Sequence, residues 1–216
     1  MSVARYFVRD ANRRAEIDEY LSKQLKRAGY SRFEMAKSPL GTRVVIYAAK
    51  PGLVIGRRGE SIKDLTKHLE ARFGVENPQL SVAALESPEL DPRVMASQVV
   101  MALEKGIHFR RACFWALQRI IEAGARGVEI TLRGKLTTER SRYEKYRQGY
   151  LPKVGEPAQR NVKVAVTDVQ LRQGLFGVQV KILPSTGDFP DKVTLIEIPE
   201  STEPQQEENL ASPEKT

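Results

Sequence analysis

The residues best suited to chemistry are two arginines that lie between two glycines, in the stretch Gly56-Arg57-Arg58-Gly59. Because the glycines have no Cβ atom, the backbone can bend sharply there and approach another chain closely. An amphipathic helix is predicted to follow, and the unpaired N–H groups at its start carry partial positive charge. Glycines, cations and a helix start together favour a loop that binds phosphate groups. The alternative is a tight turn between two helices whose arginines are only solvated.

Two further groups of cations lie in the C-terminal half of the chain. Arg110 and Arg111 fall in the first turn of a predicted helix, where a neighbouring phosphate would offset their repulsion by the helix dipole. Two exposed arginines without a ligand explain the pattern equally well. The segment 134–147 is the most basic loop region, and tyrosines lie among its cations, a combination that suits RNA or, alternatively, a half-exposed strand. Its candidate RNA-binding residues are Lys135, Arg140, Arg142, Lys145 and Arg147.

Composition favours a polyanionic partner and offers no catalytic or metal site. The chain has 216 residues and a formal net charge of +8, so nucleic acid is a natural partner. Cys113 is the only cysteine and has apolar neighbours, so we expect a buried thiol. Neither His68 nor His108 has a partner at metal-ligand spacing, and motifs for nucleotide hydrolysis or a serine nucleophile are missing. We therefore predict a protein that is not an enzyme, needs no cofactor or metal, and works in the cytoplasm away from membranes.

Apolar periodicity predicts the elements that position the glycine-rich loop. Their order is helix, strand, strand, short helix, loop, helix and strand. This order resembles a type II KH domain, in which a helix and a strand precede the core and the GxxG loop clamps a single strand. A Pro-containing turn follows, so we expect this domain over residues 1–88. The expected elements are a helix from Asp10, as its N-cap, to Gly29, strands over 30–37 and 42–49, a short helix over 53–55, a helix from Ile62 to Gly74, and a strand over 79–84.

The following residues predict a second α+β domain over 89–185. Asp91 is expected to cap its first helix, and a second helix begins near residue 107 or 108 and ends at Gly124. About four mainly antiparallel strands follow, and residues 186–216 are expected to be irregular, acidic and disordered. Two of the strands are predicted from alternating residues. In the first, a buried face of Val128, Ile130 and Leu132 alternates with a solvent-exposed face of Glu129, Thr131 and Arg133. In the second, Val162, Val164 and Val166 alternate with Lys163 and Thr167.

Four segments together resemble the third protein of the small ribosomal subunit in its archaeal form. The resemblance covers about residues 1–185 and leaves out the acidic tail. The segments are Val54-Ile55-Gly56-Arg57-Arg58-Gly59, Phe109-Arg110-Arg111-Ala112, Gly124-Ala125-Arg126-Gly127-Val128-Glu129-Ile130, and Tyr146-Arg147-Gln148-Gly149-Tyr150-Leu151-Pro152.

The resemblance implies a structural protein of the small-subunit head beside the messenger RNA entry channel. Its implied partners are small-subunit ribosomal RNA, messenger RNA and neighbouring head proteins. In that family basic residues contact incoming messenger RNA, and Arg110 and Arg111 match two of these positions. A third basic position of bacterial relatives is Phe114 here, and Arg142 or Lys145 are candidates to compensate. The alternative functions are a free-standing regulator that uses the same KH fold and, with less support, an enzyme that acts on nucleic acid.

Overall fold

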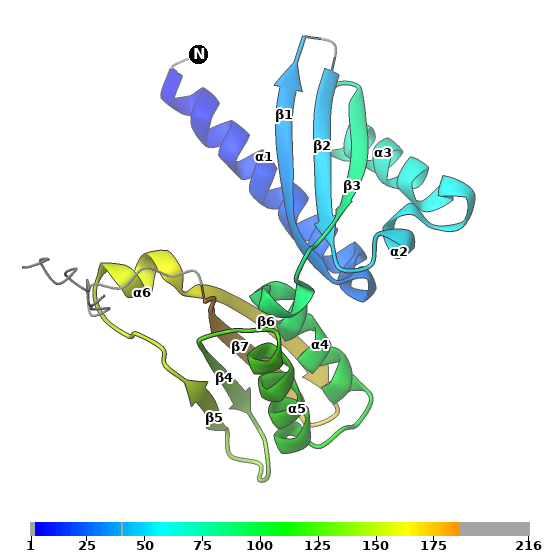
Figure 1. Cartoon of the computed structure of the whole chain (residues 1–216). Helices are drawn as coiled ribbons and strands as arrows, with labels where there is room; N and C mark the ends of the chain where they lie inside the picture. Colours follow the sequence, from blue (N-terminus) through cyan, green and yellow to red (C-terminus); the bar gives the residue numbers. More distant parts are fainter. Residues whose placement is uncertain (1–2, 40, 186–216) are drawn as a thin grey trace, which may run out of the picture.

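The computed structural model describes residues 3–39 and 41–185 and shows two α+β domains, one above the other in Figure 1. The fold class predicted from the sequence is therefore confirmed. The boundaries predicted at residues 88 and 185 stay a prediction. The expected disorder of residues 186–216 concerns a segment outside the described residues.

The N-terminal domain has the element order of a type II KH domain. Its sheet has the order β1-β2-β3, with β1 and β2 antiparallel and β2 and β3 parallel. The loop Gly56–Gly59 lies between the second and third helices, at the right edge of Figure 1. The elements are α1 (Val3–Gln24), β1 (Tyr30–Ser38), β2 (Gly41–Ala48), α2 (Pro51–Ile55), α3 (Glu60–Phe73) and β3 (Pro78–Ala84).

The helices of this domain cover one face of its sheet. In β2 the side chains of Val44, Ile46 and Ala48 are buried, whereas the alternate residues are partly or fully exposed. The buried face packs against Ile17 of α1 and Leu69 of α3. Burial of this apolar surface stabilises the packing of α3 on the sheet by about 25 cal/mol per Å². This packing positions the start of α3, and therefore the glycine-rich loop that precedes it.

Asp10 does not cap the first helix as predicted. Helix α1 begins at Val3, so Asp10 lies within it. Its carboxylate pairs with Nε of Arg14 at 3.1 Å and with Lys37 of β1. The segment before Asp10 contains no helix breaker, and its residues extend the helix beyond the predicted cap.

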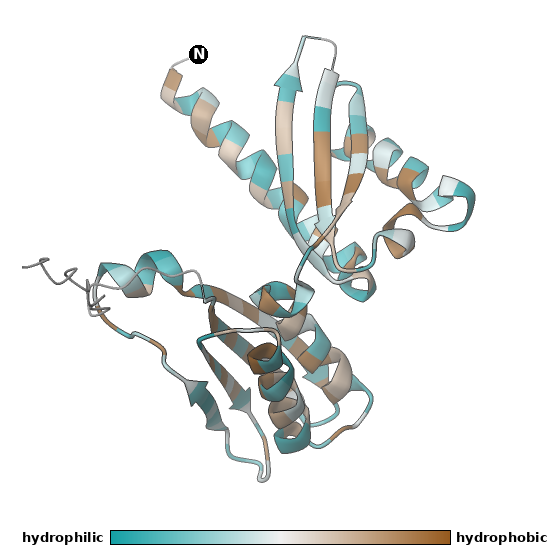
Figure 2. Cartoon of the chain, viewed as in Figure 1, coloured by the Kyte–Doolittle hydropathy of each residue, from teal (hydrophilic) through white to brown (hydrophobic). Residues whose placement is uncertain are grey.

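The second domain places two helices on one face of a four-stranded antiparallel sheet of order β5-β4-β7-β6. Asp91 caps α4 as predicted, because its carboxylate accepts a hydrogen bond from the backbone N–H of Arg93 at 2.9 Å. Figure 2 shows hydrophobic residues on β4 and β7 and hydrophilic residues along β5. The elements are α4 (Pro92–Glu104), α5 (Phe109–Glu122), β4 (Gly127–Gly134), β5 (Arg142–Gly149), α6 (Glu156–Asn161), β6 (Lys163–Leu171) and β7 (Gly174–Leu183).

Two predicted strand faces were wrong. Val164 and Val166 of β6 are 50% and 70% exposed, and Ala165 and Val169 are buried instead. The pairing of Ala165 with Val180 places the odd-numbered residues of β6 over the core. The even-numbered valines therefore lie on the solvent-exposed face, opposite to the face that their pattern predicts. On β4, the predicted wet face also fails, because Glu129 and Thr131 are only 4% and 3% exposed.

A set of polar contacts, which we call the domain latch, joins the two domains. Arg93 Nη1 donates to the two carboxylate oxygens of Asp18 at 2.9 and 3.1 Å and to the carbonyl oxygen of Ser31 at 3.0 Å. Lys26 Nζ lies 2.7 Å from Glu104 Oε1. Because these bonds connect α1, β1 and the residues around them to α4, they favour one relative orientation of the two domains.

Candidate RNA-binding surfaces

The glycine-rich loop has a backbone that only glycine can adopt at its first position. Gly56 has φ 73° and ψ −176°, and a Cβ atom there would lie 2.1 Å from Ser61 Oγ. Gly59 has φ 73° and ψ 18°, in the left-handed region, but a Cβ would meet only Ile62 at 3.8 Å. The two glycines therefore differ. At position 56 any side chain would both clash with Ser61 and need an unfavourable backbone conformation, whereas at position 59 only the backbone conformation is unfavourable.

Arg57 and Arg58 are exposed at the tip of this loop. Arg58 itself has φ 53°, an unusual value for a residue with a side chain. Helix α3 starts directly after the loop, and Gly59 supplies no side-chain cap for its first N–H groups. Two cations and a helix start thus share one surface, the arrangement expected of a phosphate-binding loop. RNA binding by Gly56, Arg57, Arg58 and Gly59 stays a prediction.

The start of α5 presents Arg110 and Arg111 on different faces of the helix. The helix is capped by His108, whose Nδ1 accepts a hydrogen bond from the N–H of Arg110 at 3.4 Å. Arg110 turns toward β5, where its Nη2 lies 3.6 Å from Glu144 Oε1. Arg111 lies on the same side of the helix as Trp115 and faces the N-terminal domain. The two neighbouring arginines therefore serve two different surfaces.

An aromatic pair lies beside Arg110. Phe114 is 60% exposed and its ring meets that of Tyr146 edge-to-face, with 5.3 Å between centroids. The Tyr146 hydroxyl donates a hydrogen bond to Glu144. Together with Arg110, this bond holds the pKa of the Glu144 carboxyl below its usual value, while burial and the carboxylate raise the pKa of Tyr146. The surface thus combines a cation with an exposed ring.

The last part of the basic segment expected to be a loop, residues 142–147, lies in strand β5, and its cations lie on both faces of the sheet. Lys145 and Arg147 face away from α5: Lys145 Nζ is 3.9 Å from Glu129 Oε1, and Arg147 pairs in register with Glu129. Arg142 lies on the same face as Glu144 because side chains alternate along a strand. Of the two candidates to compensate for Phe114, only Arg142 therefore lies on its face. Lys135 and Arg140 are exposed in the connection 135–141.

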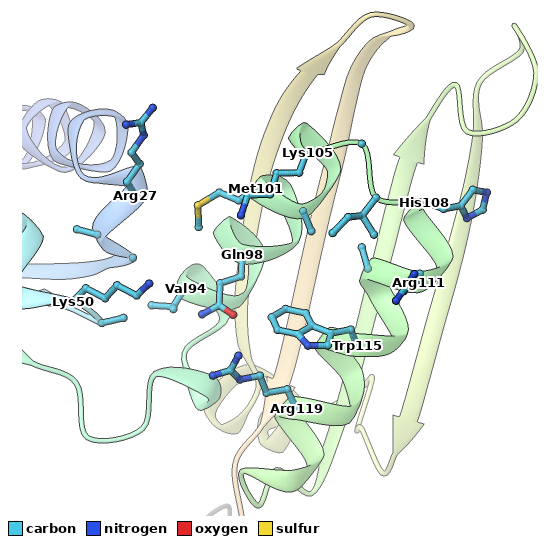
Figure 3. Close-up of a pocket in the computed structure, with 17 residues that line it drawn as sticks. Arg27, Lys50, Val94, Gln98, Met101, Lys105, His108, Arg111, Trp115 and Arg119 are labelled. Carbon is cyan, nitrogen blue, oxygen red and sulfur yellow. The ribbon is translucent and has the colours of Figure 1, made fainter.

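A surface that the sequence did not predict is a cleft of about 880 Å³ between the domains, which we call the interdomain cleft (Figure 3). Its cations come from both domains, so no local pattern reveals it. The one sequence signal is on α5, where arginines lie four residues before and after the only tryptophan. The polar and aromatic side chains that line the cleft include Arg27 and Lys50 of the KH domain and Gln98, Lys105, Arg111, Trp115 and Arg119 of the second domain.

Other chemistry finds no support in the described residues. Within residues 3–39 and 41–185, no three His, Cys, Asp or Glu side chains lie close enough to hold a metal ion. No helix in this part of the chain is long and apolar enough to cross a membrane. Cys113 is buried as predicted, and burial raises the pKa of its thiol to about 12.

Known proteins match both domains. The KH domain family matches residues 16–91, and the family described as ribosomal protein S3, C-terminal domain, matches residues 99–182. Small ribosomal subunit protein uS3 of Saccharolobus solfataricus is 46% identical over 198 residues, which cover 92% of this chain and 86% of that protein. The chain belongs to the uS3 family. The uS3 protein of Methanococcus aeolicus is 42% identical over 93% of this chain and 96% of its own length, and that of Methanocaldococcus jannaschii is 45% identical over 90% and 94%.

Membership of the uS3 family confirms the resemblance stated from the sequence. It makes the chain a structural, non-enzymatic protein of the small ribosomal subunit, located in the cytoplasm with the ribosome. Ribosomal RNA and ribosomal proteins are the partners that membership implies. The match to a second domain favours this role over a free-standing regulator, which would need only the KH fold.

Proposed function

We propose that this uS3 family member binds ribosomal RNA through its glycine-rich loop and lines the messenger RNA entry channel with the start of α5. The observation that carries the second part is the exposure of Arg110 and Arg111 in the first turn of α5, next to Phe114. Arg110 and the exposed ring of Phe114 offer a phosphate contact and base stacking on the side of α5 that faces β5, and Arg111 adds a cation on the neighbouring side of the helix. Neighbouring head proteins are the further partners of this role.

The mechanism is passive. Arginine side chains hold the backbone of an incoming strand by charge-assisted hydrogen bonds to phosphate oxygens. Phe114 stacks on a base in place of the third cation of bacterial relatives, and Arg142 adds a cation on the same face. Translocation by the ribosome supplies the pulling force, and the cations stop the opened strand from pairing again. No bond is made or broken by the protein.

Translation of messages with and without a stable hairpin tests this role. Replacing both arginines, in the variant Arg110→Ala/Arg111→Ala, is expected to lower yield from the structured message more than from the unstructured one. The matched control is Arg172→Ala, which removes an exposed arginine at the turn between β6 and β7. An equal loss on both templates would contradict the proposal, because it would indicate a general defect in the subunit.

The salt dependence of binding tests the glycine-rich loop. The variant Arg57→Asp/Arg58→Asp is expected to weaken binding to small-subunit ribosomal RNA and to flatten the plot of log affinity against log salt by roughly one unit per lost phosphate contact. The control is Lys67→Asp on the exposed side of α3. A slope equal to that of the unaltered chain would mean that these arginines do not contact phosphate.

A further inference from the structure

The interdomain cleft gathers positive charge without compensation. Arg27, Lys50, Lys105 and Arg111 make no ion pair within the described residues, and none of the residues lining the cleft is a carboxylate. Arg119 is partly offset, because its Nη2 lies 3.2 Å from Glu89 Oε1. Charges of one sign in a concave surface reinforce one another and attract a counter-charge. The cleft therefore fits a polyanion.

The same cleft exposes an aromatic ring. Trp115 is 45% exposed, and the Arg119 guanidinium lies 5.4 Å from the centre of its ring. Figure 3 shows Trp115 on α5 between Arg111 and Arg119, with Arg27 and Lys50 across from it on the KH domain. An indole flanked by cations is a platform on which a nucleobase stacks while its phosphates meet the cations.

A buried acceptor adds a third feature. Gln98 projects from α4 beside Trp115, and its side-chain oxygen is buried without a hydrogen-bond partner in the part of the chain described. Buried acceptors are normally paired, because an unpaired one loses its bond to water. Because Gln98 lines the cleft, a rotation of its side chain would bring this oxygen within reach of the amino group of a base or the 2′-hydroxyl of a ribose, either of which can donate the bond. An acidic peptide would use the cations but neither the exposed ring nor, necessarily, the amide.

We propose that the interdomain cleft binds a single-stranded RNA segment, with one base stacked on Trp115 and its flanking phosphates on Lys50, Lys105 and Arg111. The volume of about 880 Å³ is within the range of sites that enclose a ligand of nucleotide size. The ion pair between Lys26 and Glu104 joins the domains beside the cleft and helps to set its width. This site extends the proposed RNA binding to a surface separate from the glycine-rich loop and from Arg110.

Tryptophan fluorescence reports on this site alone, because Trp115 is the only tryptophan of the chain. The full chain is titrated with a short oligouridylate, a polyglutamate peptide of the same charge, and inorganic polyphosphate. Quenching by the oligouridylate alone supports a stacked base. Equal quenching by either of the other two polymers overturns the proposal in favour of a general anion site or an acidic protein partner.

Variants separate the cleft from the other RNA contacts. Binding of a labelled oligouridylate, followed by anisotropy, should weaken by about tenfold in Trp115→Ala, the effect of losing one base–aromatic stack, and recover in part in Trp115→Phe. The variant Lys50→Ala/Lys105→Ala should flatten the salt dependence by about 0.7 per lost phosphate contact on a single strand. The matched control is Lys67→Ala, an exposed lysine outside the cleft.

The two proposals fail in different ways. If the oligouridylate binds with no change in Trp115 fluorescence and equal affinity for Trp115→Ala, the cleft proposal is wrong and the RNA-binding function stands. If neither oligouridylate nor small-subunit ribosomal RNA binds the folded chain, the proposed function fails with it.

Discussion

Replacing Gly56 by alanine should disrupt the glycine-rich loop much more than the same change at Gly59. Gly56 has φ 73° and ψ −176°, a region that is nearly exclusive to glycine, so alanine costs about 2 kcal/mol there. The new Cβ would also lie 2.1 Å from Ser61 Oγ and 2.7 Å from Ser61 Cβ, and relieving this overlap costs about 1 kcal/mol more. At Gly59 the only penalty for alanine is the left-handed backbone conformation, which costs about 1 kcal/mol. The expected losses in unfolding free energy are therefore about 3 and 1 kcal/mol.

Urea unfolding of the full chain can measure this difference with an internal control. Far-UV circular dichroism follows both domains, whereas labelling of Cys113, which is buried in the core of the second domain, follows that domain alone, and its transition should be unchanged. Adding Ser61→Gly to Gly56→Ala should recover the steric part, as a coupling energy of about 1 kcal/mol in a double-mutant cycle. Equal losses in the two alanine variants, or no coupling to Ser61, would refute the reasoning.

Two further predictions concern the domain latch and the buried thiol. Arg93→Ala removes the bonds to Asp18 and should cost only about 1 kcal/mol in urea unfolding, because both side chains are partly exposed. It should also widen the distribution of domain distances seen by small-angle X-ray scattering, and an unchanged distribution would argue against the latch. Cys113 should resist a thiol reagent at pH 8, because burial keeps it neutral with a pKa of about 12. It should react at once in urea, and rapid labelling of the native chain would contradict its burial.

Local patterns predicted most of the fold. Strand β2, the Asp91 cap and the glycine-rich loop each depend on a few adjacent residues, so their chemistry is visible in the sequence. The failures are long-range. The faces of β6 depend on the register of Val180 opposite Ala165, and Glu129 is buried because the residues between Leu151 and Val162 lie over its side of the sheet. Such packing overrides an alternating pattern.

The candidate site was predicted only in part for the same reason. Arg57 and Arg58 lie within one loop, so their spacing alone predicts that they share one surface. The sequence offers Lys145 as a candidate to compensate for Phe114, but the pleat of β5 points Lys145 to the opposite face of the sheet. The interdomain cleft depends on how the domains meet, and neither domain alone contains the signal of Lys50 facing Trp115.

The domain latch has a consequence for how the protein joins a larger assembly. The contacts of the domain latch favour one angle between the domains, and therefore one separation between the glycine-rich loop and the start of α5 before any RNA is present. In the proposed function, RNA bound at one of these two sites presents the other site to the second strand at a high effective concentration. Because little conformational entropy between the domains is then lost on binding, two sites of low affinity can together give tight binding.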